Sequence, residues 1–267
     1  MRMLERKPDS RKGENGRVLV VGGSEVYHGA PLFSALGAEY SGVDLIYPVI
    51  PKCHAEVAKS TSLNFIVHSF SKNYLTKKDV PLILDLSGKT DVLVMGPGLG
   101  EDEETIKAMK KILENIEIPL VLDASALLVA DVLTKRERVL TPHRGEFEKM
   151  AGVTPATDEK EIENQALGVA GKFDAVVVLK GSRDVIASPS GDLKINTKGN
   201  AGLTAGGTGD LLSGLIGGLI AQGVEPFQAS FLATKVIGTI GEALFEERGW
   251  AYRAVDVVRK IPGFLKK

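Results

Sequence analysis

The sequence predicts a single α/β domain, residues 1–267, with a mainly parallel central sheet and helices on both faces. Short β-branched and aliphatic runs alternate with helical patterns along the whole chain, which is typical of a buried parallel sheet. Near the C-terminal part of the sheet, two short strands flank the turn cluster at residues 189–192, which predicts one antiparallel hairpin. No Pro/Ser-rich linker, charge block or internal repeat divides the chain.

The predicted elements follow one another from the first buried run. Strands are expected at residues 17–22, 43–50, 64–68, 91–95, 119–123, 138–140, 175–179, 185–187 and 193–196. Helices are expected at residues 29–40, 102–116, 159–172, 208–221, 226–247 and 255–260. The helix at 102–116 begins with acidic residues and ends near two lysines, an order that complements the helix dipole.

Composition excludes several classes of protein. With 43% hydrophobic and 25% charged residues the chain is ordinary for a globular protein. A net charge of −1 gives no support for nucleic acid or an acidic membrane surface as a partner. The single cysteine, Cys53, excludes an internal disulfide and suits a reducing cytoplasm. The N-terminus is too polar for a signal peptide, and the most apolar window, 211–221, is too short to cross a bilayer.

The most informative segment is rich in glycine. Five glycines lie between positions 199 and 209, and Asp210 and an apolar helical run follow them directly. Backbone N–H groups at a helix start favour an anion such as phosphate. Because a carboxylate there repels phosphate, Asp210 is interpreted as an acid–base residue on the rim of an anion site at residues 206–210. The alternative is a plain glycine-rich turn.

Two further glycine-containing segments follow predicted strands. Residues 22–31 have neither the Walker Lys-Ser/Thr nor the dinucleotide-binding glycine spacing, so they are interpreted as a loop lining a pocket. In the run 96–100 the third glycine of a dinucleotide fingerprint is replaced by Glu101. That run is therefore expected to be a tight turn at which a ligand touches backbone.

Two charged clusters also follow strands. His143 and Glu146 are three residues apart and either face one pocket or form the N-cap of a helix that starts at Arg144. Lys180, followed by Gly181, suits contact with a nucleotide phosphate or base, and the alternative is the solvated entry to a hairpin. His28 and the pair at 53–54 have no metal-ligand spacing.

These pieces, in this order, resemble the ADP/ATP-dependent NAD(P)H-hydrate dehydratase family of the ribokinase-like superfamily. The matching segments are residues 22–31, 96–100, 123–127, 140–147, 179–184 and 196–223. Most specific are Gly206-Gly207-Thr208-Gly209-Asp210, with the apolar run that follows, and the loop from Gly23 through Tyr27 to Gly29-Ala30-Pro31. The family removes water from the hydrated nicotinamide ring of NADH or NADPH and is driven by nucleotide hydrolysis.

The resemblance implies a set of site residues. The hydrate site would be lined by Ala30, Gly98, Gly100, His143 and Asp210, and Asp210 would be the catalytic base. The adenine nucleotide would be contacted by Lys180, Gly181, Ser182, Arg183, Asp184, Gly206, Gly207, Thr208 and Gly209. ADP or ATP is expected as co-substrate with Mg²⁺, whose ligands are left open. The expected protein is a cytoplasmic homo-oligomer that binds small molecules, not nucleic acid or membrane.

Two departures from the family pattern affect single positions. The family often has Asp where this chain has Ser125, so an acid role there is absent, and it usually has Pro where this chain has Arg144. In many organisms an epimerase domain is fused to this one. With the first strand beginning after about 16 residues, the standalone form is expected here.

Two other functions use the same residues. A ribokinase-like kinase would share the anion site and Asp210 but stop at a phosphorylated product. A non-catalytic nucleotide-binding regulator is disfavoured, because Asp210 would then only weaken phosphate binding.

Overall fold

The computed structural model describes residues 6–132, 134 and 136–266, and within them the strands form one sheet of nine. The spatial order is β3-β2-β1-β4-β5-β6-β7-β8-β9. The strands are β1 (Arg17–Val21), β2 (Leu45–Ile50), β3 (His68–Ser69), β4 (Val92–Met95), β5 (Leu120–Leu122), β6 (Arg138–Leu140), β7 (Val176–Leu179), β8 (Asp184–Ala187) and β9 (Leu193–Asn196).

The strand directions confirm the predicted fold class. All pairs from β3 to β7 are parallel, whereas β7–β8 and β8–β9 are antiparallel. The antiparallel part is the hairpin predicted around residues 189–192. Strand β1 lies between β2 and β4, so the chain order reverses there, as in other doubly wound sheets.

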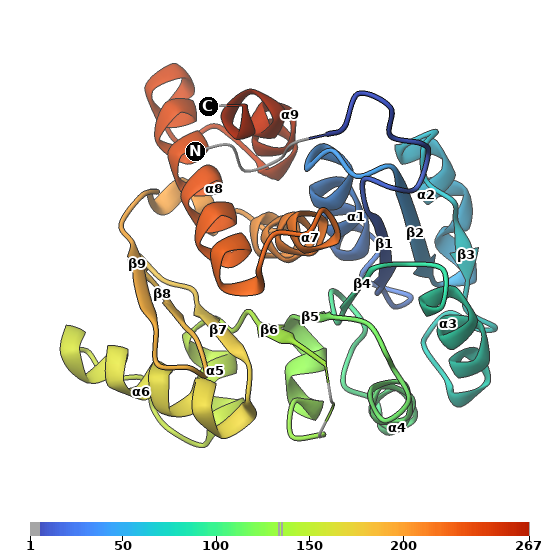
Figure 1. The fold of residues 1–267 in the computed structure, drawn as a ribbon, viewed down its shortest axis with the longest axis horizontal. Helices are drawn as coiled ribbons and strands as arrows, with labels where there is room; N and C mark the ends of the chain where they lie inside the picture. The colour runs from blue at the N-terminus through green and yellow to red at the C-terminus, as the bar shows by residue number, and fades with distance from the viewer. Residues whose placement is uncertain (1–5, 133, 135, 267) are drawn as a thin grey trace.

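Helices cover both faces of this sheet (Figure 1). They are α1 (Gly29–Tyr40), α2 (Ala55–Thr61), α3 (Val80–Ser87), α4 (Glu103–Leu113), α5 (Arg144–Ala151), α6 (Glu159–Phe173), α7 (Thr208–Ala221), α8 (Pro226–Arg248) and α9 (Ala254–Leu265). Short 3₁₀ turns add η1 (Lys52–His54), η2 (Lys77–Asp79), η3 (Ala124–Val129) and η4 (Ala201–Thr204). In Figure 1, α1, α7, α8 and α9 lie above the sheet, and α3 to α6 lie below it.

Each face of the sheet has its own hydrophobic core. Along β1, Val18 and Val20 belong to the core under α1, α7, α8 and α9, whereas Leu19 and Val21 belong to the core under α3 to α6. All four side chains are fully buried. This strict alternation is the pleat of a strand that is covered on both sides.

The sequence mispredicts the edge of the sheet. A strand was expected at 64–68, but β3 comprises only His68–Ser69, and Phe65 contributes a single isolated bridge to Ile46. The side-chain amide of Asn64 donates a hydrogen bond to the Glu39 carboxylate at 2.6 Å. The short helices α2 and α3 were also missed, because seven or eight residues carry little periodic signal.

Helices α1 and α7 pack with their backbones in close contact. A Cβ on Gly214 would lie 1.8 Å from the carbonyl oxygen of Ser34, and one on Gly37 would lie 2.3 Å from that of Leu211. One turn on, a Cβ at Gly218 would meet the Ser41 hydroxyl at 2.2 Å. The stripe of small residues therefore sets how closely the start of α7 approaches α1.

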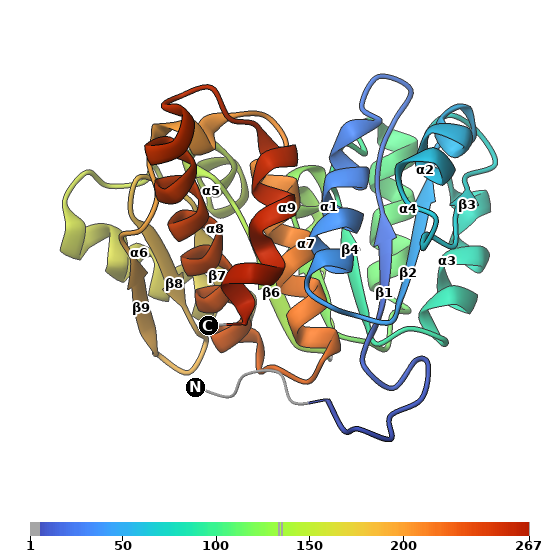
Figure 2. The same cartoon turned by 90° about the horizontal axis from the view of Figure 1, so that it is seen from above.

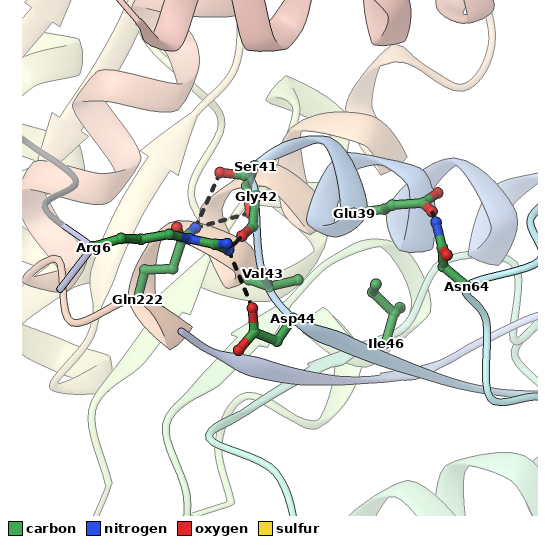
Figure 3. A pocket seen from close by; sticks show the side chains of 9 residues that line it. All are labelled: Arg6, Glu39, Ser41, Gly42, Val43, Asp44, Ile46, Asn64 and Gln222. Atoms are coloured by element: carbon green, nitrogen blue, oxygen red, sulfur yellow. Dashed lines mark hydrogen bonds and ion pairs between the residues drawn. The ribbon is translucent and has the colours of Figure 1, made fainter. Parts of the chain in front are cut away.

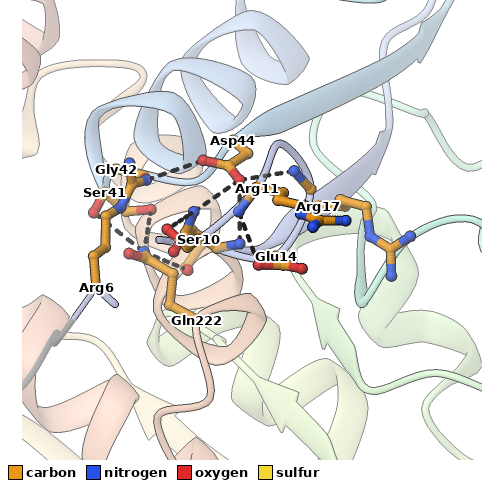
Figure 4. Close-up of polar contacts among 12 residues, drawn as sticks. Arg6, Ser10, Arg11, Glu14, Arg17, Ser41, Gly42, Asp44 and Gln222 are labelled. Carbon is orange, nitrogen blue, oxygen red and sulfur yellow. Dashed lines mark hydrogen bonds and ion pairs between the residues drawn. The ribbon is translucent and has the colours of Figure 1, made fainter. Parts of the chain in front are cut away.

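The segment before β1 packs against the amino-terminal edge of the sheet. Asp44 accepts hydrogen bonds from the backbone of Gly13 at 2.8 Å and of Asn15 at 3.2 Å, and it pairs with Arg6 at 3.3 Å (Figure 4). Beside this cluster a cavity of about 510 Å³ is lined by residues that include Arg6, Asp44 and Gln222 (Figure 3). Its polar groups are largely paired with one another.

Candidate active site

The candidate site lies at the carboxyl edge of the parallel strands. Asp123 follows β5, His143 follows β6 and Lys180 follows β7, and the start of α7 faces them. Figure 2 shows the loop after β1 and the segment before α7 rising at the same, upper edge of the sheet. Open α/β sheets bind ligands at this edge.

A cavity of about 770 Å³ opens at this edge. It is large enough for a nucleotide, since sites for small molecules and cofactors measure about 300–1,000 Å³. Its lining consists of His143, Lys180, Gly181, Ser182, Asp184, Lys198, Gly199, Asn200, Ala201, Leu203, Thr204, Ala205, Gly206, Gly207, Thr208, Gly209, Leu212, Thr234, Ile237 and Gly238.

The glycine-rich turn leaves the start of α7 open toward this cavity. Gly207 is the N-cap, with φ +94°, and no side chain among the described residues caps the helix. A Cβ on Gly207 would lie 2.5 Å from the Phe33 ring, so this glycine is required by close packing as well as by its backbone angle. The N–H groups of the first turn lack intrahelical acceptors and favour an anion.

Thr208 contributes to this turn through its side chain. Its hydroxyl donates to the carbonyl oxygens of Leu203 at 2.6 Å and Ala205 at 3.0 Å. The hydroxyl therefore stabilises the loop whose residues 206–209 line the cavity.

Lys180 places a buried cation against this helix start. Its side chain is 18% exposed, and Nζ lies 3.0 Å from Oδ1 of Asp123, whose side chain is 3% exposed. Nζ also lies 4.0 Å from Oε2 of Glu146 and 3.3 Å from the position a Cβ on Gly209 would take. Burial alone would lower the pKa of Lys180, but the Asp123 and Glu146 carboxylates more than offset it and raise that pKa.

Asp210 sits in the first turn of α7 beside this cluster. Burial, and then the like charge of Asp123, raise the pKa of Asp210 to about 7, against the opposing effect of the Lys180 ammonium. A carboxyl group with a pKa near neutrality can accept a proton and later release it. The start of α7 thus presents N–H groups that lack intrahelical acceptors beside a carboxyl group whose pKa is raised, the features that the predicted anion site and acid–base residue require.

His143 caps helix α5. Its Nδ1 accepts hydrogen bonds from the backbone of Gly145 at 3.1 Å and of Glu146 at 3.2 Å, and the Glu146 carboxylate accepts from the His143 backbone at 2.8 Å. The imidazole is 61% exposed and also lines the cavity. The N-cap alternative therefore holds, and of His143 and Glu146 only His143 lines the cavity.

The neighbouring Arg144 has a structural contact. Its guanidinium donates to the carbonyl oxygens of Pro155 at 2.7 Å and Ala156 at 2.8 Å. The residue that departs from the family pattern therefore ties the loop after α5 to the start of that helix.

Of residues 180–184, at the start of the hairpin, four line the cavity and one does not. Lys180, Gly181, Ser182 and Asp184 line the cavity, and the Asp184 carboxylate accepts from the Gly181 backbone at 3.0 Å. Arg183, which was also predicted to contact the nucleotide, points away from the cavity. Its guanidinium pairs with Glu163 of α6 at 2.7 Å, and Arg183 is not among the cavity-lining residues.

Three of the predicted hydrate residues, Ala30, Gly98 and Gly100, belong to a second group beside α1, whereas His143 lines the larger cavity and Asp210 lies in α7. A Cβ on Gly98 would lie 3.2 Å from Cβ of Ala30 and 2.9 Å from that of Tyr27, so the turn after β4 meets the first turn of α1. Gly98 and Gly100 have φ of +72° and +81°, backbone angles that favour glycine. These residues lie outside the lining of the larger cavity. Because Gly207 packs on Phe33 of α1, the start of α7 connects the two groups.

Sequence reasoning missed several cavity residues. Asn200 accepts from the Tyr252 hydroxyl at 2.6 Å and donates to the carbonyl of Gly241 at 2.8 Å, which fixes the loop before η4. Thr234 and Ile237 reach the cavity from α8. The lone Asn between glycines was a usable signal, whereas nothing in the pattern of α8 distinguishes its cavity-facing residues. The sequence shows Asp123 as a polar residue at the end of a buried strand, but it does not show that Asp123 pairs with Lys180.

Residues 6–132, 134 and 136–266 contain neither a cluster of metal-ligating side chains nor a membrane-spanning helix. No group of three or more His, Cys, Asp or Glu side chains in this part of the chain could hold a metal ion. None of its helices combines the length and apolar character that a membrane span requires.

The sequence and the fold are similar to those of several known proteins. Residues 18–263 match the family described as NAD(P)H-hydrate dehydratase. The ADP-dependent (S)-NAD(P)H-hydrate dehydratase of Nitrosopumilus maritimus is 37% identical over 98% of this chain and 92% of its own. The bifunctional NAD(P)H-hydrate repair enzyme of Methanothermobacter thermautotrophicus is 36% identical over 99% of this chain, which spans about half (52%) of that relative.

A solved structure extends the similarity to three dimensions. The ADP/ATP-dependent NAD(P)H-hydrate dehydratase of Bacillus subtilis, co-crystallised with ATP and Mg²⁺, superposes with a TM-score of 0.87 at 30% identity. The match covers 98% of this chain and 93% of that one. A ribokinase-like superfamily protein of Enterococcus faecalis superposes with a TM-score of 0.86 at 25% identity, which confirms the ribokinase-like fold.

Proposed function

The chain belongs to the NAD(P)H-hydrate dehydratase family, and we propose that it removes water from hydrated NADH or NADPH at the expense of an adenine nucleotide. The observation that carries this proposal is Asp210, a carboxyl group with a pKa of about 7 at the open start of α7 and beside the buried Lys180. The relative from Nitrosopumilus maritimus is named as ADP-dependent and that from Bacillus subtilis as ADP/ATP-dependent, so ADP is the proposed phosphoryl donor, with ATP as the alternative.

The two groups of residues suit the two substrates. The adenine nucleotide occupies the larger cavity, with its base against Leu212 and Ile237 and its phosphates at the backbone of residues 206–209. The hydrated ring lies on the α1 side, against Ala30 and Gly98. The reacting hydroxyl and the terminal phosphorus then meet at the start of α7, beside Asp210.

The chemistry is phosphoryl transfer followed by elimination. Asp210 accepts the proton of the ring hydroxyl, and the hydroxyl oxygen forms a bond to the terminal phosphorus as the donor nucleotide leaves. The N–H groups at the start of α7 and the Lys180 ammonium stabilise the charge on the transferred group. The C–O bond then breaks with phosphate as leaving group, and loss of a proton from the neighbouring carbon restores the dihydronicotinamide. Phosphate leaves far more readily than hydroxide.

Magnesium fits this site only together with the nucleotide. The described residues hold no three-ligand cluster, and the Asp123 carboxylate is already bonded to Lys180. Mg²⁺ usually keeps several waters and binds substrate phosphates through few protein groups. When bound, it would neutralise phosphate charge.

The test is a direct assay. We expect NADH hydrate incubated with the protein and ADP to regain the dihydronicotinamide absorbance near ~340 nm, a property of the reduced cofactor. Omitting nucleotide is the control, and ATP is run in parallel. Consumption of nucleotide with a stable phosphorylated product and no recovered absorbance would establish a kinase instead. Binding without turnover would establish a regulator.

His143 allows the two roles of a pocket residue to be separated. His143 lines the nucleotide cavity but lies beside Lys180, close to where the two substrates would meet. His143→Ala is therefore expected to raise the KM for hydrate more than it weakens ADP binding, and to destabilise the fold by about 0.5–2 kcal/mol through loss of the α5 cap. His143→Asn keeps a side-chain oxygen that can cap the helix but removes the ring. We expect Asn to restore thermal stability and leave the KM raised.

The measurements for both variants are hydrate kinetics, ADP calorimetry and thermal melts. Recovery of both stability and KM in His143→Asn would mean that the histidine serves only as a cap. An equal loss of affinity for both ligands would indicate a deformed site.

The remaining expectations are also part of this proposal. NADH and NADPH are cofactors of cytoplasmic metabolism, so a repair enzyme acting on them is expected in the cytoplasm. The homo-oligomeric state stays a prediction, and the mass of the protein in solution tests it.

A further inference from the structure

The ammonium of Lys180 lies among three carboxyl groups that come from different elements. Asp123 follows β5, Glu146 belongs to α5 and Asp210 belongs to the first turn of α7, and all three interact electrostatically with Lys180. Within the described residues, Nζ donates a hydrogen bond to Oδ1 of Asp123 at 3.0 Å and lies 4.0 Å from Oε2 of Glu146. The cation is thus bonded to Asp123, while Asp210 is a neighbour.

This arrangement poses an electrostatic problem. A buried ammonium normally pairs with the nearest carboxylate, and a carboxylate paired with a cation becomes a weak base. Asp210 is a candidate competitor, because it interacts electrostatically with Lys180 and because Nζ lies against the first turn of α7, 3.3 Å from the Cβ position of Gly209. If Lys180 turned to Asp210, the cation would occupy the base that the reaction needs.

We propose that Asp123 is a positioning residue that holds the Lys180 ammonium away from Asp210 and thereby keeps Asp210 available as a proton acceptor. Asp123 is suited to this role because its carboxylate is almost completely buried and its backbone is fixed. The Asp123 carbonyl oxygen lies 1.8 Å from where a Cβ on Gly96 would stand, so the turn after β4 packs directly on it. The role in turnover rests on the proposed function, whereas the electrostatic claim does not.

The first measurement needs neither substrate nor activity. The carboxyl titration of Asp210 is followed by NMR in protein carrying isotope-labelled aspartate, with the resonance assigned by its loss in Asp210→Asn. In the unaltered protein the midpoint is expected near the pKa of about 7. In Asp123→Asn the like charge that raises the pKa of Asp210 is gone and the freed ammonium should pair with Asp210, so the midpoint should fall by about one unit or more. The smaller Asp123→Ser variant, which removes the same charge without filling the space, should do the same.

A double variant identifies the group responsible. In Asp123→Asn combined with Lys180→Met, both charges of the pair are gone and burial still acts on Asp210. The midpoint should therefore return close to that of the unaltered protein. Lys180→Met alone should raise the midpoint by less than this recovery, because Asp123 holds the ammonium away from Asp210 in the unaltered protein. A midpoint that stays low in the double variant, or a recovery no larger than the rise in Lys180→Met alone, would overturn the proposal. An unchanged midpoint in both single variants at Asp123 would overturn it as well.

Asp44 supplies the matched control. It is another largely buried carboxylate, with 12% of its side chain exposed, and it holds Arg6 and two backbone N–H groups at the opposite edge of the sheet. Asp44→Asn should leave the Asp210 midpoint in place even if it lowers thermal stability. An equal shift in this variant would attribute the effect to general loosening of the fold and contradict the assignment.

The kinetic readout follows if the dehydratase assay succeeds. Asp123→Asn should lower kcat at neutral pH by about tenfold, because a weaker base accepts the hydroxyl proton less readily. The KM for hydrate should change little, and the acid limb of the pH profile should move to lower pH. A loss of kcat with an unmoved pH profile would mean a merely structural role. Failure of the dehydratase assay itself would leave the NMR result to decide the electrostatic claim.

Discussion

Replacing Asp210 with asparagine is expected to lower turnover by about 10²–10⁴-fold, the usual loss when a general base is removed. Asn fills the same space at the start of α7 but cannot accept the hydroxyl proton. Binding of ADP should persist or become slightly tighter, because a negative charge beside the phosphates is gone. Steady-state kinetics test the expected loss of turnover, and calorimetry tests the binding of ADP. Activity within a few-fold of the unaltered protein would contradict the assignment of Asp210 as the base.

The same residue predicts a pH dependence. Because the base must be ionised to act, kcat should rise as the pH passes through about 7, the pKa of Asp210, and then level off. Asp210→Asn should abolish this rise in any residual activity. A pH profile that is flat between pH values well below and above this pKa would exclude Asp210 as the group that controls the rate.

The stability of the fold should fall as the pH rises, whereas kcat should rise. The folded protein raises the pKa of Asp210 from its ordinary 3.8 to about 7, so folding favours the protonated form. The stability that this proton contributes is fully present below about pH 4 and is lost as the pH rises through about 7. Asp210→Asn, which is never charged, should therefore melt at a higher temperature than the unaltered protein at pH 8 and show little advantage near pH 4. Loss of activity with gain of stability is not expected from damage to the fold.

Gly214→Ala is expected to cause the largest loss of stability. The added Cβ would lie 1.8 Å from the Ser34 carbonyl oxygen and 2.6 Å from its carbon. These are backbone atoms of α1, so no side chain can turn aside, and α1 and α7 must separate. We expect a loss of about 3 kcal/mol or more, at the upper end for overpacked cores.

The control is a helical glycine with free space around it. Gly168 is exposed in α6, and nothing lies within 4 Å of its Cβ position. Gly168→Ala should stabilise the protein by about 0.5–1 kcal/mol, because alanine restricts the unfolded chain and suits a helix. Urea denaturation of both variants makes the comparison. Similar effects of the two substitutions would show that α1 and α7 are not in backbone contact.

Local pattern was sufficient for most elements. Helices α1 (Gly29–Tyr40) and α7 (Thr208–Ala221), and strands β6 (Arg138–Leu140) and β9 (Leu193–Asn196), have the predicted bounds. Periodicity, caps and glycines are encoded over a few residues, so they can be read without knowledge of the fold. The bounds of strand β3 could not be predicted in this way, because a two-residue strand at the edge of the sheet depends on pairing with its neighbour β2.

The sequence by itself determined the fold class, and it predicted the anion site at residues 206–209 and the acid at Asp210, since each depends on contiguous residues. Only the tertiary structure decided which charges meet there. Asp123 and Lys180 are 57 positions apart, and their pairing follows from the placing of β5 and β7 on either side of β6. Likewise, only the packing of α6 against the hairpin directs Arg183 to Glu163 and away from the cavity. Side-chain partners across a sheet are set by strand order, and no local pattern carries that order.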